Sequence, residues 1–184
     1  FTHDTAGRTL SVTDPEGGVL ERNISTAGQL VWQDDPSDNR TGFTYDTAGR
    51  LTVTTRADTT TLQSEYWGDG QLKTRIDGAN AATGYVYDAA GRLSTSTDPL
   101  NRVTTYGYDL GGRRTSVQGP GGNCAATPKL ECTSFTYNTS NQVTAVAYSD
   151  DNGVITPDVT NLTYDGNGRR TAITDGTGNS TWVW

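Results

Sequence analysis

Apolar and polar residues alternate in short stretches, and turn-forming residues separate these stretches. In residues 43–45 a Phe and a Tyr flank a Thr, and in residues 51–54 a Leu and a Val alternate with two Thr. A period of two is typical of a β-strand with one apolar face. Between the two stretches, Asp46 and Gly49 occupy the first and fourth positions of a type I turn. The pattern predicts a β-hairpin in which Tyr45 and Leu51 are cross-strand neighbours on one face.

This unit recurs along the whole chain. Close copies are FTHDTAGR (1–8), FTYDTAGR (43–50), YVYDAAGR (85–92), YGYDLGGR (106–113) and LTYDGNGR (162–169), and weaker copies begin at residues 22, 64 and 135. From the first turn glycine to the sixth, the step is constant at 21 residues. Glycine supplies the positive φ that such a turn requires, so we expect it at all the turn glycines. These are Gly7, Gly28, Gly49, Gly70, Gly91, Gly112 and Gly168.

A second turn signal follows seven residues after the glycine in most units, for example at Asp98-Pro99. Two turns per unit leave two short strands, so eight units predict an all-β fold, an antiparallel meander of about 16 strands. The spacing widens after the sixth unit, where residues 119–133 are predicted to form an inserted loop and residues 149–157 a second extension. We expect residues 1–184 to form one array of about eight repeats and to be a segment of a longer chain.

Composition narrows the possible classes of protein. Only 32% of the residues are hydrophobic and 19% are charged, which argues against both a thick two-sided core and a highly charged disordered chain. The net charge of −7 disfavours nucleic acid as a partner, because an acidic surface repels phosphate. No apolar run approaches the length of a membrane span, so none is expected.

The repeated motif Tyr-Asp-x-x-Gly-Arg-Leu, followed by Asp-Pro-x-Asn-Arg, resembles the YD repeat of the RHS family. The match is close at residues 45–51 and closer at residues 87–93, which continue into residues 98–103. The tyrosine–aspartate pairs of the good copies are Tyr45-Asp46, Tyr87-Asp88, Tyr108-Asp109 and Tyr164-Asp165. The resemblance covers essentially the whole chain.

This resemblance implies more than the spacing does. The family includes bacterial RHS toxins, shell components of insecticidal toxin complexes, wall-associated proteins and teneurins, in which the repeats form one long sheet that coils into a hollow shell. It implies a coiled single-sheet shell or β-solenoid, and an extracellular or cell-surface location. In the toxins the shell holds a C-terminal effector, which an aspartic-protease-like core domain releases. The motifs of that core are not found in this sequence.

The sequence offers little for catalysis, a cofactor or a metal, and we expect none of them. The single histidine, His3, occupies the tyrosine position of the first repeat, where a surface histidine is expected. Residues 165–168 resemble a fragment of a calcium loop but lack its twelve-residue ligand spacing. Most other aspartates stand at turn positions, where Asp is favoured for structural reasons.

Cys124 and Cys132 both fall in the predicted inserted loop. A disulfide between them is the leading interpretation and implies an oxidising compartment. Reduced cysteines in a cytosolic toxin precursor are the alternative.

Arginine recurs directly after the turn glycine, at Arg8, Arg50, Arg92, Arg113 and Arg169. These side chains are expected to stack on neighbouring tyrosines or to pair with Asp across the strand. A track that binds glycans or anions is the alternative.

The ends of a meander leave unpaired strand edges, and residues 181–184, Thr-Trp-Val-Trp, predict an apolar terminal strand. We therefore expect the edges to pair with neighbouring repeats of a longer chain or with further copies of this chain. A surface glycan and an encapsulated effector are the other partners considered.

Overall fold

The structure is a computed structural model that describes residues 1–126, 129–150, 153–159 and 161–183. Within these residues all regular secondary structure is β-strand, and more than half of the chain lies in strands. The described part contains no helix with the length and apolarity needed to cross a bilayer. The chain divides into two compact units, Phe1–Gly84 and Tyr85–Trp184. The predicted all-β antiparallel fold is confirmed.

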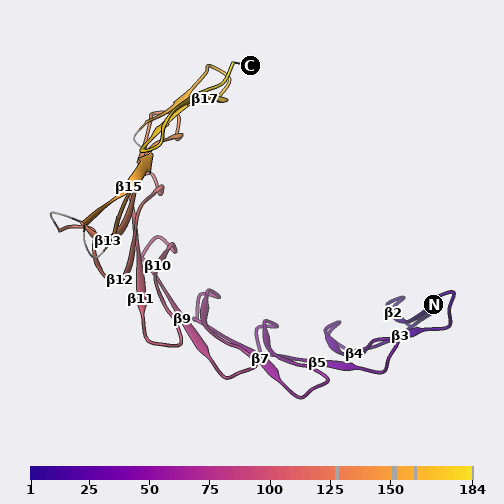
Figure 1. The fold of residues 1–184 in the computed structure, drawn as a ribbon. Coiled ribbons are helices and arrows are strands. Elements are labelled where there is room, and N and C mark those ends of the chain that lie inside the picture. Colours follow the sequence, from indigo (N-terminus) through magenta and orange to yellow (C-terminus); the bar gives the residue numbers. More distant parts are fainter. Residues whose placement is uncertain (127–128, 151–152, 160, 184) are drawn as a thin grey trace. The chain divides into compact units, whose positions relative to one another are not determined.

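The first unit is an antiparallel meander in which each strand pairs with the next one in the sequence. Its strands lie side by side as a single layer (Figure 1). They are β1 (Thr2–His3), β2 (Thr9–Thr13), β3 (Val19–Ile24), β4 (Leu30–Asp34), β5 (Arg40–Tyr45), β6 (Leu51–Thr55), β7 (Thr61–Tyr66), β8 (Leu72–Ile76) and β9 (Ala82–Tyr87), whose last three residues belong to the second unit.

The second unit begins with hairpins of the same kind and ends in a separate small sheet. Strands β10 to β15 pair consecutively, whereas β16 to β18 form a separate three-stranded sheet. Within this unit β16 contacts β14, and β17 contacts β15. The strands are β10 (Leu93–Thr97), β11 (Val103–Tyr108), β12 (Arg114–Asn123), β13 (Leu130–Tyr137), β14 (Val143–Asp150), β15 (Gly153–Val159), β16 (Asn161–Tyr164), β17 (Arg170–Asp175) and β18 (Gly178–Thr181).

Three expectations need correction here. The described residues contain 18 strands rather than about 16, because β15 and β18 are additional. Most of the expected loop at 119–133 is strand, since β12 and β13 extend into it on either side. The terminal strand ends at Thr181 instead of continuing through residues 181–184, and Trp184 lies outside the described residues.

The two strands of the hairpin formed by β5 and β6 are offset by a bulge beside the turn. Tyr45 pairs with Leu51, but Thr44 pairs with Val53, so one residue of β6 is left over. Paired residues lie on the same face of the sheet, so Phe43 and Thr54 lie on one face, and Val53 and Thr44 lie on the other. The bulge therefore divides the apolar residues of a repeat between the two faces, which simple alternation did not predict.

The meander has almost no buried core. Among the side chains whose burial the structure describes, the buried ones are Cys132 (3% exposed), Leu162 (8%) and Ser149 (9%). All three lie in the second unit, where β16 contacts β14. In the first unit the sheet is a single layer, so backbone pairing between strands and polar contacts at the hairpin turns join one repeat to the next.

Candidate functional site

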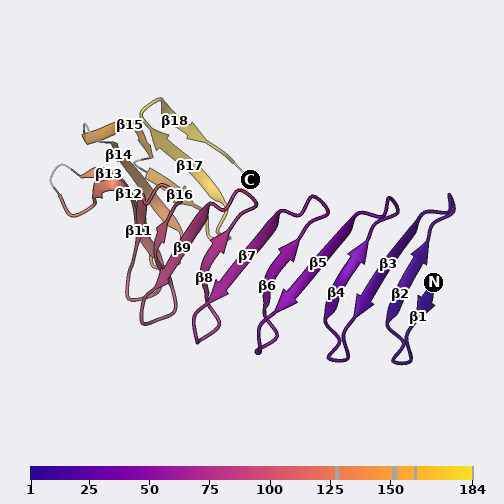
Figure 2. The same cartoon turned by 90° about the horizontal axis from the view of Figure 1, so that it is seen from below.

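Each repeat contains a five-residue turn directly after its tyrosine position, called here the YD turn. The eight YD turns are residues 4–8, 25–29, 46–50, 67–71, 88–92, 109–113, 138–142 and 165–169. In each, the first N–H donates to the fifth carbonyl at 2.8–2.9 Å, and the fourth N–H donates to the first carbonyl. Within the first unit these turns follow one another along one end of the strands, opposite the turns that join successive repeats (Figure 2).

The fourth residue of every YD turn has a left-handed backbone. All seven turn glycines of the sequence analysis adopt positive φ, from 75° to 94°. The seventh repeat places Asn141 at this position with a φ of 62°. Glycine reaches this region without strain, and asparagine is one of the few other residues that tolerate it.

The aspartate at the first position organises the rest of the turn. Asp46 Oδ1 accepts hydrogen bonds from the N–H groups of Ala48 and Arg50, both at 2.9 Å. Asp46 Oδ2 accepts from Arg50 Nε at 2.7 Å. The backbone N–H of Arg50 and then its guanidinium hold the pKa of Asp46 below its usual value, so the carboxylate is ionised at neutral pH. Asp4, Asp88, Asp109 and Asp165 have the same arrangement.

The arginine at the fifth position joins its own turn to the YD turn of the next repeat. Arg50 Nη1 donates to the backbone carbonyl of Trp67 at 3.0 Å, and its guanidinium lies 4.8 Å from the centre of the Tyr66 ring. Tyr66 in turn donates its hydroxyl to the carbonyl of Leu51 at 2.8 Å. We call this set of contacts the clasp. It consists of the Asp–Arg ion pair within one YD turn, the hydrogen bond and ring contact of that arginine with the next YD turn and the tyrosine before it, and the hydrogen bond from that tyrosine back to the preceding repeat.

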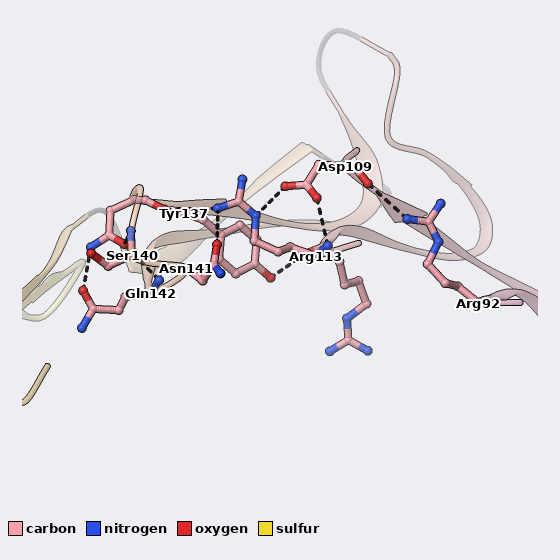
Figure 3. A network of polar contacts seen from close by, with 9 residues as sticks. Arg92, Asp109, Arg113, Tyr137, Ser140, Asn141 and Gln142 are labelled. Carbon is pink, nitrogen blue, oxygen red and sulfur yellow. Dashed lines mark hydrogen bonds and ion pairs between the residues drawn. The ribbon is translucent and has the colours of Figure 1, made fainter. Parts of the chain in front are cut away.

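The clasp recurs twice in the second unit. Arg92 donates to the carbonyl of Asp109 at 3.1 Å and lies 4.6 Å from the Tyr108 ring. Arg113 donates to the carbonyl of Asn138 and to Asn141 Oδ1, both at 3.1 Å, and lies 4.9 Å from the Tyr137 ring (Figure 3). The tyrosine hydroxyls complete each clasp by donating to the carbonyls of the preceding repeat. The structure thus places Tyr108-Asp109 between two successive clasps.

The remaining predicted pairs follow the same rule in part. Tyr45 donates to the carbonyl of Leu30 at 3.0 Å, and Tyr164 donates to that of Val143 at 2.7 Å. In the repeats that precede these two, glutamine stands in place of the arginine. At the first junction Arg8 reaches the carbonyl of Ser25 at 3.0 Å, but Ile24 offers it no ring. Tyr87 lies at the end of β9, directly before the turn of Asp88.

These contacts correct one expectation about the arginines. They pair with the aspartate of their own turn rather than with an aspartate across the strand. The expected stacking on neighbouring tyrosines is confirmed at Arg50, Arg92 and Arg113, each of which stacks on the tyrosine of the following repeat. At Arg50, Arg92 and Arg113, both Nε and Nη1 donate to groups of the protein itself.

The turns at the other end of the strands have a feature that the sequence analysis missed. Their fourth residue is also left-handed, and it is often not glycine. It is Asp38, Thr59, Asn80 or Asn101, with φ between 60° and 66°. The signal was present in the Asp-Pro-x-Asn motif, because the spacing from Asp98 to Asn101 equals that from Asp46 to Gly49. Both kinds of turn therefore share one geometry.

Cys124 directly follows β12, and Cys132 lies within β13. Their Sγ atoms are 2.04 Å apart, a bonded distance, and their Cα atoms are 5.2 Å apart. Cys124 is not part of a paired strand, and its N–H donates a hydrogen bond to Gln118 Oε1 at 3.1 Å. Cys132 N donates to Ser149 Oγ, which donates to the Cys132 carbonyl. The disulfide thus lies beside the small buried cluster of the second unit.

Candidate catalytic or metal-binding residues are not brought together. His3 lies in β1 and is exposed. In the described ranges, no group of three His, Cys, Asp or Glu residues is placed to hold a metal ion. Asp165 is engaged by the amides and arginine of its own turn.

Both a known repeat family and several solved structures are similar to this chain. The RHS Repeat family profile matches residues 66–99 and 87–123. A search of curated protein sequences finds no match. Among solved structures, TcdB2-TccC3 without its hypervariable C-terminal region matches with a TM-score of 0.72 and 18% identity, covering 98% of this chain and 11% of that one. TcdB2-TccC3 itself matches with a TM-score of 0.71 and 19% identity, covering 98% and 12%.

The pore state of the Photorhabdus luminescens Tc holotoxin, with a mutated TccC3, matches with a TM-score of 0.66 and 20% identity, covering 91% of this chain and 10% of that one. At these identities the likeness is one of fold, and the chain spans about a tenth of the length of the structures it matches. The repeats, the family match and the shell-type fold agree with one another. The repeats of residues 66–123 match the RHS Repeat family, and the fold of the chain is similar to that of the TcdB2-TccC3 structures.

Proposed function

We propose that this chain is a non-catalytic structural segment of an extracellular bacterial RHS-type protein, and that it builds a wall in the form of a shell, stalk or filament. The clasp carries this proposal. It recurs at three junctions between successive repeats and uses the most regular polar residues of the sequence to hold neighbouring hairpins together. Residues devoted to joining repeats are what a repeat array needs, because each repeat contacts only its neighbours.

The state of the aspartates supports a structural role. Asp46, Asp109 and Asp165 all have a lowered pKa, first because of the backbone N–H of the turn arginine. Such carboxylates are permanent hydrogen-bond acceptors at neutral pH. A general acid would require a raised pKa instead.

A container for an effector encoded outside this sequence is the second candidate. The shell-type fold shared with the TcdB2-TccC3 chains favours it, and this segment would then correspond to about a tenth of the length of such a chain. A surface that binds glycans or anions through the arginines is less favoured, because the clasp arginines donate to the protein's own carboxylates and carbonyls.

The proposed wall should grow through its outer strands. Within the described residues, β18 pairs with β17 alone. Trp182 N–H donates inward to the Thr171 carbonyl at 2.8 Å, so alternation directs the Thr181 N–H outward. We expect the purified chain to associate with a concentration dependence that light scattering after size-exclusion chromatography detects. Thr181→Pro, which removes an outward donor, should weaken this association.

Thr47→Pro is the matched control for this experiment. It places proline at the second position of a YD turn, the position that Pro15, Pro36 and Pro99 occupy in the turns at the other end of the strands. It should leave association unchanged. A monodisperse monomer at all concentrations, with both variants indistinguishable from the wild type, would contradict assembly through the outer strands.

A further inference from the structure

The fifth position of the YD turn alternates between two residue types with different reach. It is arginine in five turns and glutamine in three, at Gln29, Gln71 and Gln142. Arginine has donors for its own aspartate and for the next turn at the same time, whereas the glutamine amide has a single NH₂ group. The junctions between repeats are therefore not equivalent.

Two neighbouring strand pairs in the first unit allow a direct comparison. The pairs β4–β5 and β6–β7 each have three cross-strand residue pairs, and each is joined by a five-residue turn. Each also has the tyrosine bond to the preceding repeat, at 3.0 Å from Tyr45 and at 2.8 Å from Tyr66. Their backbone pairing does not distinguish them.

They differ at the YD turns. Beside β6–β7, Arg50 bonds the carbonyl of Trp67 and stacks on Tyr66. Beside β4–β5, the Gln29 amide reaches the next turn, where a Cβ on Gly49 would lie 3.5 Å from Nε2. Among the contacts of the described residues, however, there is no hydrogen bond from the Gln29 side chain to that turn.

The opposite end of β4–β5 is held firmly. Arg40 pairs with Asp34 at 2.7 Å and lies 3.9 Å from the centre of the Trp32 ring. Opening of this strand pair should therefore begin at its YD end.

The junction at Gln142 is also weakly connected to the next YD turn. Gln142 Nε2 reaches the Gly168 carbonyl only at 3.5 Å, and its Oε1 accepts from Asn138 Nδ2 of its own turn at 2.7 Å. At this junction the consecutive strand pairing also stops, because β16 to β18 form a separate sheet.

We infer that the junctions at Gln29 and Gln142 are built-in points of opening, at which neighbouring repeats separate more readily than at the arginine clasps. This goes beyond a structural role, because it gives the array defined sites at which it yields. The free energy of local opening varies along a protein, and a side-chain contact that bridges two elements raises it locally.

Amide hydrogen exchange of the intact chain, followed residue by residue by NMR, tests the inference. At the YD end of the strands, amides that bond across β4–β5 should exchange about 3- to 10-fold faster than those across β6–β7, the ratio that one hydrogen bond supplies. Arg50→Gln should raise exchange across β6–β7 to the rate of β4–β5. Ser25→Asp combined with Gln29→Arg, which builds a complete Asp–Arg pair, should slow exchange across β4–β5.

Equal exchange across the two pairs in the wild type would overturn the inference, and so would an Arg50→Gln variant that exchanges like the wild type. If Arg50→Gln does not fold, Arg50→Lys serves instead, because it keeps the positive charge near Asp46 but lacks the forked donor that reaches Trp67. Neither outcome depends on whether the array forms a shell or a filament.

Discussion

The left-handed position of the YD turn offers a clean test of how the sequence specifies the fold. Gly112 has a φ of 82°, and a Cβ placed on it would have its nearest neighbour, Arg92 Nη1, at 4.0 Å. Space is therefore not limiting, and the effect of a side chain comes from the backbone alone. We expect Gly112→Val to destabilise the chain by roughly 2–3 kcal/mol, because a β-branched residue is strained in this region.

Gly112→Asn is the matched control. Asn141 occupies the same turn position with a φ of 62°, so the fold already accepts asparagine there. We expect it to cost less than about 1 kcal/mol. In calorimetry or circular dichroism, the valine variant should lower the melting temperature by about 4–12 °C and the asparagine variant by less than about 4 °C. Equal shifts for both variants would refute the reasoning from backbone strain.

Two further predictions concern the polar contacts of the clasp. Tyr108→Phe removes the hydroxyl that donates to Leu93 at 2.9 Å but keeps the ring under Arg92, so we expect a loss of about 1 kcal/mol in the free energy of unfolding, measured by urea denaturation. The turn aspartates have lowered pKa values when folded, so the unfolded chain takes up protons first as the pH falls. Their stabilisation should be complete above about pH 5 and fall progressively below about pH 4. A urea midpoint that stays constant from pH 7 to pH 3 would contradict this.

Much of the fold can be predicted from the sequence because the turn-forming residues recur at a fixed spacing. The 21-residue step locates the YD turns, and the position of Gly49 relative to Asp46 specifies the turn type. Local chemistry of this kind depends on few residues, and it recurs, so each copy supports the others.

The clasp was harder to predict because it depends on contacts between repeats. The sequence shows that Arg50 recurs, but not that its Nη1 reaches the carbonyl of Trp67, 17 residues away. A backbone carbonyl carries no residue identity, so no sequence pattern marks it as an acceptor. The division of Phe43 and Val53 between the two faces was missed for a related reason, since the bulge that separates them is set by hydrogen bonding within the hairpin.

The disulfide provides a last test, which concerns how far an effect travels along the array. Cys124 and Cys132 are 8 positions apart in the sequence, so bonding them should contribute roughly 2–3 kcal/mol by restricting the unfolded chain. Cys124→Ala combined with Cys132→Ala should therefore speed amide exchange in β12 to β14, where Cys132 N donates to Ser149 Oγ. Because stability in a repeat array is a sum of nearest-neighbour terms, β1 to β8 should keep their exchange rates. Faster exchange spread evenly over all strands would show that the chain unfolds as one cooperative unit, and the nearest-neighbour description would then be wrong.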